Sequence, residues 1–152
     1  MDRYNAAKSI CMQPLIVLVI IFALLIVPLG WWTALRIALA AMFLLTASAH
    51  WGKRRADLIR MVPAVFSRPN VLVTMTGVCE IAGAVGLLIP GLAPIAAIGL
   101  ALLLIAIFPA NVRAARDRIA IAGRPPTPLP VRATIQVIFL LAAIGIVVGA
   151  KR

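Results

Sequence analysis

One glutamate stands inside an otherwise apolar stretch of the sequence. Glu80 lies in GVCEIAGAVGLLIP, residues 77–90, which holds no other charged residue. A carboxyl group in hydrocarbon either takes up a proton or finds a partner that compensates its charge. The residues three and four positions away are mostly small: Thr76, Gly77, Gly83 and Ala84. Such a face packs against another helix more readily than against lipid, so we expect Glu80 to point into a helical bundle.

Arg36 is the cation that we expect to pair with Glu80. Counted from the membrane edge at which His50 lies, Arg36 is roughly 21 Å deep and Glu80 roughly 15 Å deep. The difference is about one helical turn, which an arginine side chain can bridge. The sequence therefore predicts a buried Arg36–Glu80 ion pair, which either belongs to a functional site or only locks two helices together.

Further polar residues are expected near the same edge. His50 is the only histidine in the chain, and histidine can exchange protons near neutral pH or donate to a ligand carbonyl. A lone histidine at a helix end is also commonly a plain interfacial residue. Asn111 ends an apolar run, and Gln136 lies about one and a half turns into the last one. We predict one cavity lined by the ligand-binding candidates His50, Asn111, Glu80, Arg36 and Gln136.

The composition is that of a membrane protein. Of 152 residues, 64% are hydrophobic and 12% are charged, whereas soluble domains carry about 25% charged residues. Residues 9–35, 81–112 and 133–150 hold no charge at all. Runs of this length indicate transmembrane helices, which need about 20 residues each. A membrane β-barrel would instead alternate in polarity over segments of about 10 residues.

We predict an all-α fold, a polytopic membrane helical bundle that forms a single membrane domain over residues 1–152. The first span also has features of a signal peptide, but its length and the lack of a cleavage motif before Trp31 favour a retained helix. The five predicted spans are 14–29, 31–50, 70–90, 92–111 and 131–149.

The basic residues predict the orientation. The long connections 51–70 and 112–132 hold five basic residues each, whereas the short turns PLGWW and IPGLAP hold none. Five spans place both basic connections on the side of the N-terminus, and the positive-inside rule makes that side cytoplasmic. We expect a multi-pass plasma (inner) membrane protein with an external C-terminus. Four spans with both termini inside would also satisfy the charges.

The same charges bear on partners and cofactors. The net charge of +11 is explained by contact with lipid headgroups, so the bilayer is the expected partner and nucleic acid is not. One histidine cannot supply bis-histidine haem ligation, and Cys11 and Cys79 cannot hold an iron–sulfur cluster. We expect no metal and no covalently bound cofactor. A quinone is the expected carrier if electrons are handled, with a redox partner protein or a second copy as further partners.

Four segments resemble the DoxX-like membrane proteins, in order and spacing, over residues 31–150. They are RIALAAMFLLTASAHW (36–51), MVP (61–63), TGVCEIAGAVGLLIP (76–90) and FPANV (108–112). The resemblance implies a four-span helical core, to which this chain adds an N-terminal helix. It places five residues at motif positions: Arg36, His50, Glu80, Pro109 and Asn111. Trp51 departs from it, because phenylalanine is more usual there.

The family takes its name from a subunit of a thiosulfate:quinone oxidoreductase. The resemblance therefore implies a redox-associated subunit that binds a quinone-like or lipid ligand, without implying a particular reaction. Two alternatives stay open. The protein is a non-catalytic assembly or scaffold subunit, in which the polar residues only specify packing, or it is a small proton-coupled transporter. The sequence does not decide whether the protein is an enzyme.

Overall fold

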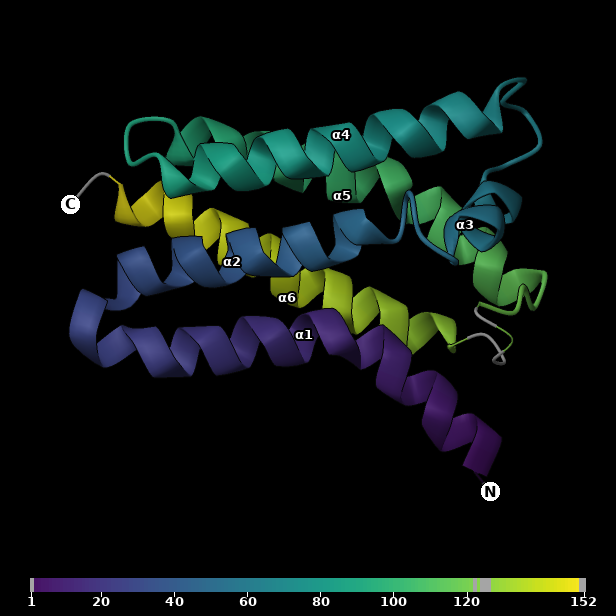
Figure 1. The fold of residues 1–152 in the computed structure, drawn as a ribbon, viewed down its shortest axis with the longest axis horizontal. Helices are drawn as coiled ribbons and strands as arrows, with labels where there is room; N and C mark the ends of the chain where they lie inside the picture. Colours follow the sequence, from purple (N-terminus) through teal and green to yellow (C-terminus); the bar gives the residue numbers. More distant parts are fainter. Residues whose placement is uncertain (1, 122, 124–126, 151–152) are drawn as a thin grey trace.

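The chain forms six α-helices in the residues that the computed structural model describes, 2–121, 123 and 127–150, with side chains described from residue 12 onward. They follow one another as shown in Figure 1. Their bounds are α1 Asp2–Leu29, α2 Trp31–Ser48, α3 Arg55–Met61, α4 Pro69–Leu88, α5 Ala93–Arg116 and α6 Leu129–Gly149.

Five of these helices are long and apolar enough to cross a membrane: α1 from Met12 onward, α2, α4, α5 and α6. The helix α3 has 7 residues and cannot. The five predicted spans fall on these helices, with ends that differ by a few residues; α5 continues to Arg116. The protein is a polytopic, all-α membrane protein, as the sequence predicts, and its single domain stays a prediction.

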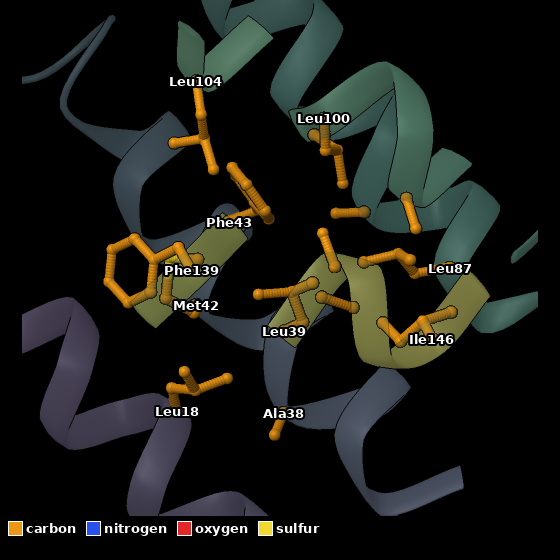
Figure 2. Packing of buried hydrophobic residues seen from close by; sticks show 14 of the residues in the cluster. Leu18, Ala38, Leu39, Met42, Phe43, Leu87, Leu100, Leu104, Phe139 and Ile146 are labelled. Atoms are coloured by element: carbon orange, nitrogen blue, oxygen red, sulfur yellow. The ribbon is translucent and has the colours of Figure 1, made fainter. Parts of the chain in front are cut away.

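The helices α2, α4, α5 and α6 form a four-helix core. Each packs against two others in the order α2–α4–α5–α6, and α6 closes the ring on α2. Large side chains from all four meet at the centre, as Figure 2 shows for Leu39, Leu87, Leu100 and Ile146. Because lipid is as apolar as these side chains, close van der Waals packing holds such a core together.

The helix α1 lies outside this core and packs mainly on α2. Its lipid-side residues Val19, Leu24 and Val27 are exposed. Pro14 lies inside the helix, where it removes a backbone hydrogen bond and bends the axis. The N-terminal part of α1 accordingly turns away from the bundle in Figure 1. The four-helix core with an added N-terminal helix agrees with the prediction.

The two ends of the bundle differ in charge. We call the end at which α2 and α5 finish, α4 and α6 begin and α3 lies the basic end. It carries the basic residues of both long connections that the structure describes. The opposite end, which we call the turn end, holds the uncharged connections between α1 and α2 and between α4 and α5. The four core helices and α3 therefore determine together the position of any functional side chain near the basic end.

Glycine allows α4 and α5 to approach closely. A Cβ atom added at Gly83 would lie 2.5 Å from Cγ of Leu100. Leu100 is 1% exposed, so its side chain has no free space into which it could move. A Cβ atom at Gly99, on α5, would meet nothing within 4 Å.

We expect Gly83→Ala to destabilise the bundle, because overpacking a tight contact costs about 1–3 kcal/mol. Gly99→Ala is the matched control, since alanine there adds helix propensity without a clash. Thermal unfolding in mild detergent should show a lower melting temperature for Gly83→Ala only. Equal melting temperatures for the two variants would contradict the close contact between α4 and α5.

Candidate functional site

The basic end contains a cavity of about 510 Å³. Ligand pockets for small molecules span roughly 300–1,000 Å³, with mostly apolar walls and a few placed polar groups. This cavity has that character, with Met42, Phe43, Leu104, Ile135 and Phe139 among its apolar lining. Four of the five predicted ligand-binding residues also line it: His50, Glu80, Asn111 and Gln136. Ligand binding in this cavity stays a prediction.

Glu80 points into the bundle, as expected from the small residues around it. It is 4% exposed. Its Oε2 atom lies 2.9 Å from Oγ1 of Thr46, and its Oε1 atom lies 4.0 Å from Nε2 of His50. The immediate polar neighbours of the carboxyl group are therefore a hydroxyl and an imidazole, both contributed by the end of α2 and the residues after it.

The predicted Arg36–Glu80 ion pair is not formed, and Arg36 does not line the cavity. Its Nε donates to the carbonyl of Leu87 and its Nη2 to the carbonyl of Leu88, both at 2.8 Å. The guanidinium also lies 4.5 Å from the centre of the Trp32 ring. Arg36 thus caps the C-terminal end of α4, where carbonyl groups lack helical partners and a positive charge is favoured.

The reason lies in the relative heights of α2 and α4. The depth count made from the sequence assumes that His50 and the first residue of α4 lie at the same depth in the membrane. In the structure, a Cβ atom added at Gly77 would lie 2.7 Å from the Cβ of His50, so α4 extends about two turns beyond the end of α2. Glu80 is consequently level with Thr46. Arg36, ten residues earlier in the chain, lies about 15 Å away along the axis.

His50 lies just beyond the end of α2 and is buried, with 8% exposure. This burial argues against a plain interfacial residue, which was the alternative that the sequence left open. Arg55 donates to the His50 carbonyl at 2.7 Å and to Thr74 Oγ1 at 2.9 Å, which ties the loop to α4. Burial, and then the charge of Arg55, lower the pKa of His50, so the imidazole is neutral at neutral pH.

A second polar group faces the cavity from α5 and α6. Arg132 donates through Nη1 to Oδ1 of Asn111 at 3.1 Å, and Gln136 donates to the carbonyl of Leu104 at 2.9 Å. The amide of Asn111 reaches Oε1 of Gln136 only at 3.5 Å, which is long for a hydrogen bond. An N–H group of the Asn111 amide is therefore available to donate a hydrogen bond to a ligand.

Some cavity residues were not predicted. Arg132 was counted among the basic residues of the connection 112–132 and not among the ligand-binding candidates, although the predicted span 131–149 also contains it. It lies in the first turn of α6, one turn before Gln136. Thr46 lies one turn before His50 on the same face, and this spacing was the available signal. Gln13 of α1 accepts a hydrogen bond from Arg54 at 3.0 Å, so α1 completes the wall. Cys79 is exposed and unbonded; the Cys11 side chain lies outside the described residues.

The arrangement suits an amphipathic ligand. Among the described residues, no three histidine, cysteine, aspartate or glutamate side chains lie close enough together to hold a metal ion. The polar groups around the cavity are donors and acceptors of hydrogen bonds, and the rest of the wall is apolar. Such a site can orient a polar head group and bury an apolar ring or chain beside it.

Comparison with known proteins finds one family. The family described as a domain of unknown function, DUF8561, matches residues 39–147. The matched segment holds nearly all of the four core helices and the polar cavity residues from Thr46 to Gln136, whereas Arg36 lies before it. No curated protein and no solved structure matches the chain.

Two double-mutant cycles test this geometry. We expect Glu80→Ala and Thr46→Val to be non-additive, with a coupling of about 0.5–3 kcal/mol, because the two side chains touch. Glu80→Ala and Arg36→Leu should add without coupling, because the residues are distant and share no partner. Unfolding in mild detergent measures both cycles. Coupling between Glu80 and Arg36 with none between Glu80 and Thr46 would contradict the observed register.

Proposed function

Because the chain belongs to the DUF8561 family of unknown function, we propose its function from the cavity. The protein is a ligand-binding subunit of the membrane, and its ligand is a quinone-like ring or a lipid. We further propose that it is redox-associated, in line with its resemblance to the DoxX-like proteins. The observation that carries this proposal is the cavity of about 510 Å³, with an apolar wall and polar groups on several helices.

The positions of the aromatic residues support a ring-shaped ligand. Phe43 and Phe139 both line the cavity, and both belong to the buried apolar cluster drawn in Figure 2. Aromatic side chains favour offset or edge-on contacts with another ring. A quinone carbonyl accepts hydrogen bonds, and the amide of Asn111 and the imidazole of His50 can donate them.

The redox part of the proposal assigns the work to two chains. This chain would hold and orient the organic carrier, and a partner subunit would supply or remove electrons. The support comes from four residues at positions of the DoxX-like motif that all line the cavity: His50, Glu80, Pro109 and Asn111. All but Pro109 are polar. Arg36, the fifth motif residue, does not line it and has a capping role instead.

A scaffold function is the second candidate. The hydrogen bonds of Arg132 to Asn111 and of Gln136 to Leu104 join α5 and α6 without any ligand. Polar contacts of this kind can specify how helices pack. In this case the cavity would be filled by lipid chains of no particular chemistry, and a quinone would not bind with saturation.

Ligand binding can be measured through Trp51, whose ring centre lies 6.1 Å from that of His50. We expect a quinone analogue to quench tryptophan fluorescence with saturation, and Trp51→Phe to remove most of that signal. Asn111→Ala should weaken binding about fivefold, because one hydrogen bond contributes about 1 kcal/mol.

Asn70→Ala is the matched control. Asn70 lies at the same end of the bundle but does not line the cavity, so its variant should bind like the unchanged protein. Quenching without saturation, or binding that Asn111→Ala leaves unaltered, would favour the scaffold function.

We also propose that the protein lies in the plasma (inner) membrane with the basic end in the cytoplasm, since basic residues stay on that side. With Cys11 and Cys79 replaced by serine, Gly91→Cys at the turn end should react with an impermeant thiol reagent on intact cells. Lys53→Cys at the basic end should react only after lysis. Labelling of Lys53→Cys in intact cells would contradict this orientation and place the basic end outside the cell.

A further inference from the structure

The hydroxyl of Thr46 has two oxygen neighbours and one hydrogen. Its Oγ1 atom lies 2.9 Å from the carbonyl oxygen of Phe43 and 2.9 Å from Oε2 of Glu80. A threonine hydroxyl donates only once. If Glu80 were ionised, one of these two short contacts would bring oxygen atoms together without a hydrogen between them. If Glu80 is protonated, it donates to Thr46, and Thr46 donates to Phe43.

The charges around Glu80 favour the same protonation state. No arginine or lysine of the described residues lies within 4.0 Å of its carboxyl group. The imidazole of His50 lies 4.0 Å from the carboxyl group, and it is neutral because of its burial. The other charged residues that line the cavity are Arg54, before α3, and Arg132, on α6. The lining residues from α1, α3 and α5 carry no charge. An isolated buried carboxylate is costly, whereas a neutral acid is not.

We propose that Glu80 is a proton-binding site inside the membrane, which holds its proton at neutral pH and exchanges it through His50. The protonated Oε2 of the carboxyl group donates a hydrogen bond to Oγ1 of Thr46. The other oxygen, Oε1, faces the imidazole of His50, 4.0 Å away. A neutral imidazole can accept a proton at one nitrogen and release one from the other. To exchange the proton, the carboxyl group rotates until its hydrogen faces Nε2 of His50, and this nitrogen takes the proton. The imidazole then releases its other proton into the cavity from Nδ1, which has no hydrogen-bond partner among the described residues.

This site goes beyond the proposed binding of a ligand and does not depend on it. Glu80 and His50 both line the cavity. A molecule bound there would therefore contact Glu80, which can supply one proton and lies deeper in the membrane than His50. Any ligand that gains or loses a proton when it reacts or moves could use this pair. The assignment of the proton to Glu80 holds equally if the cavity contains only lipid.

Infrared spectroscopy on the whole chain in lipid vesicles tests the proposal directly. Glu80 is the only glutamate in the sequence, so cell-free synthesis with glutamate carrying heavy carbon in its side-chain carboxyl labels this one acid without mutation. We expect the C=O band of a protonated carboxylic acid at neutral pH, shifted by the label. Only carboxylate bands responding to the label at neutral pH would overturn the proposal.

Variants locate the proton further. Thr46→Val should shift the band to higher frequency, because the acid loses its hydrogen-bond acceptor, and Thr46→Ser should leave the band in place. Asp117→Asn, which removes an exposed carboxylate paired with Arg113, should not alter it. His50→Ala should keep the band but slow its shift after transfer to deuterated water. An unchanged exchange rate in His50→Ala would remove His50 from the proton path and overturn that part of the proposal.

Discussion

Hydrocarbon offers no hydrogen bonds, so every polar side chain inside this bundle must find its partners within the protein. The chain meets this constraint in two separate places, except at Nδ1 of His50, which is buried without a hydrogen-bond partner among the described residues. At the turn end, the guanidinium of Arg36 donates to the last carbonyl groups of α4 and lies over Trp32. At the basic end, Thr46, His50 and Glu80 form one cluster, and Asn111, Arg132 and Gln136 form another. The apolar core shown in Figure 2 lies largely between the two ends.

The difference between the two ends explains why the polar cavity lies at the basic end and not around Arg36. Arg36 fills its place completely, because its long side chain reaches across from α2 to α4. At the basic end, α4 extends past α2, and the space beside it is bounded by α3, by the loop that Arg55 fastens to α4 and by the bent helix α1. The short side chains of Thr46 and Asn111 leave this space open.

The fold could be predicted because it depends on features that the sequence shows directly. Runs without charge mark the membrane helices, and the small residues around Glu80 show which face of α4 is buried. The partner of Glu80 could not be predicted in the same way. Which residues of α2 and α4 lie level depends on how far α4 extends past α2, and the close approach of Gly77 to His50 sets this only in three dimensions. Thr46 was missed because a threonine in an apolar helix usually bonds only to its own backbone.

The central claim is that the basic-end cavity is a binding site and not a gap that side chains close in lipid. A crystal structure of the protein grown from a lipid phase tests this most directly. We predict density for a bound amphipathic molecule, with its apolar part beside Phe43 and Phe139 and its polar part near His50 and Asn111. A structure in which side chains of α1, α2 and α6 move together and fill this space, with the polar residues bonded only to each other, would contradict the claim.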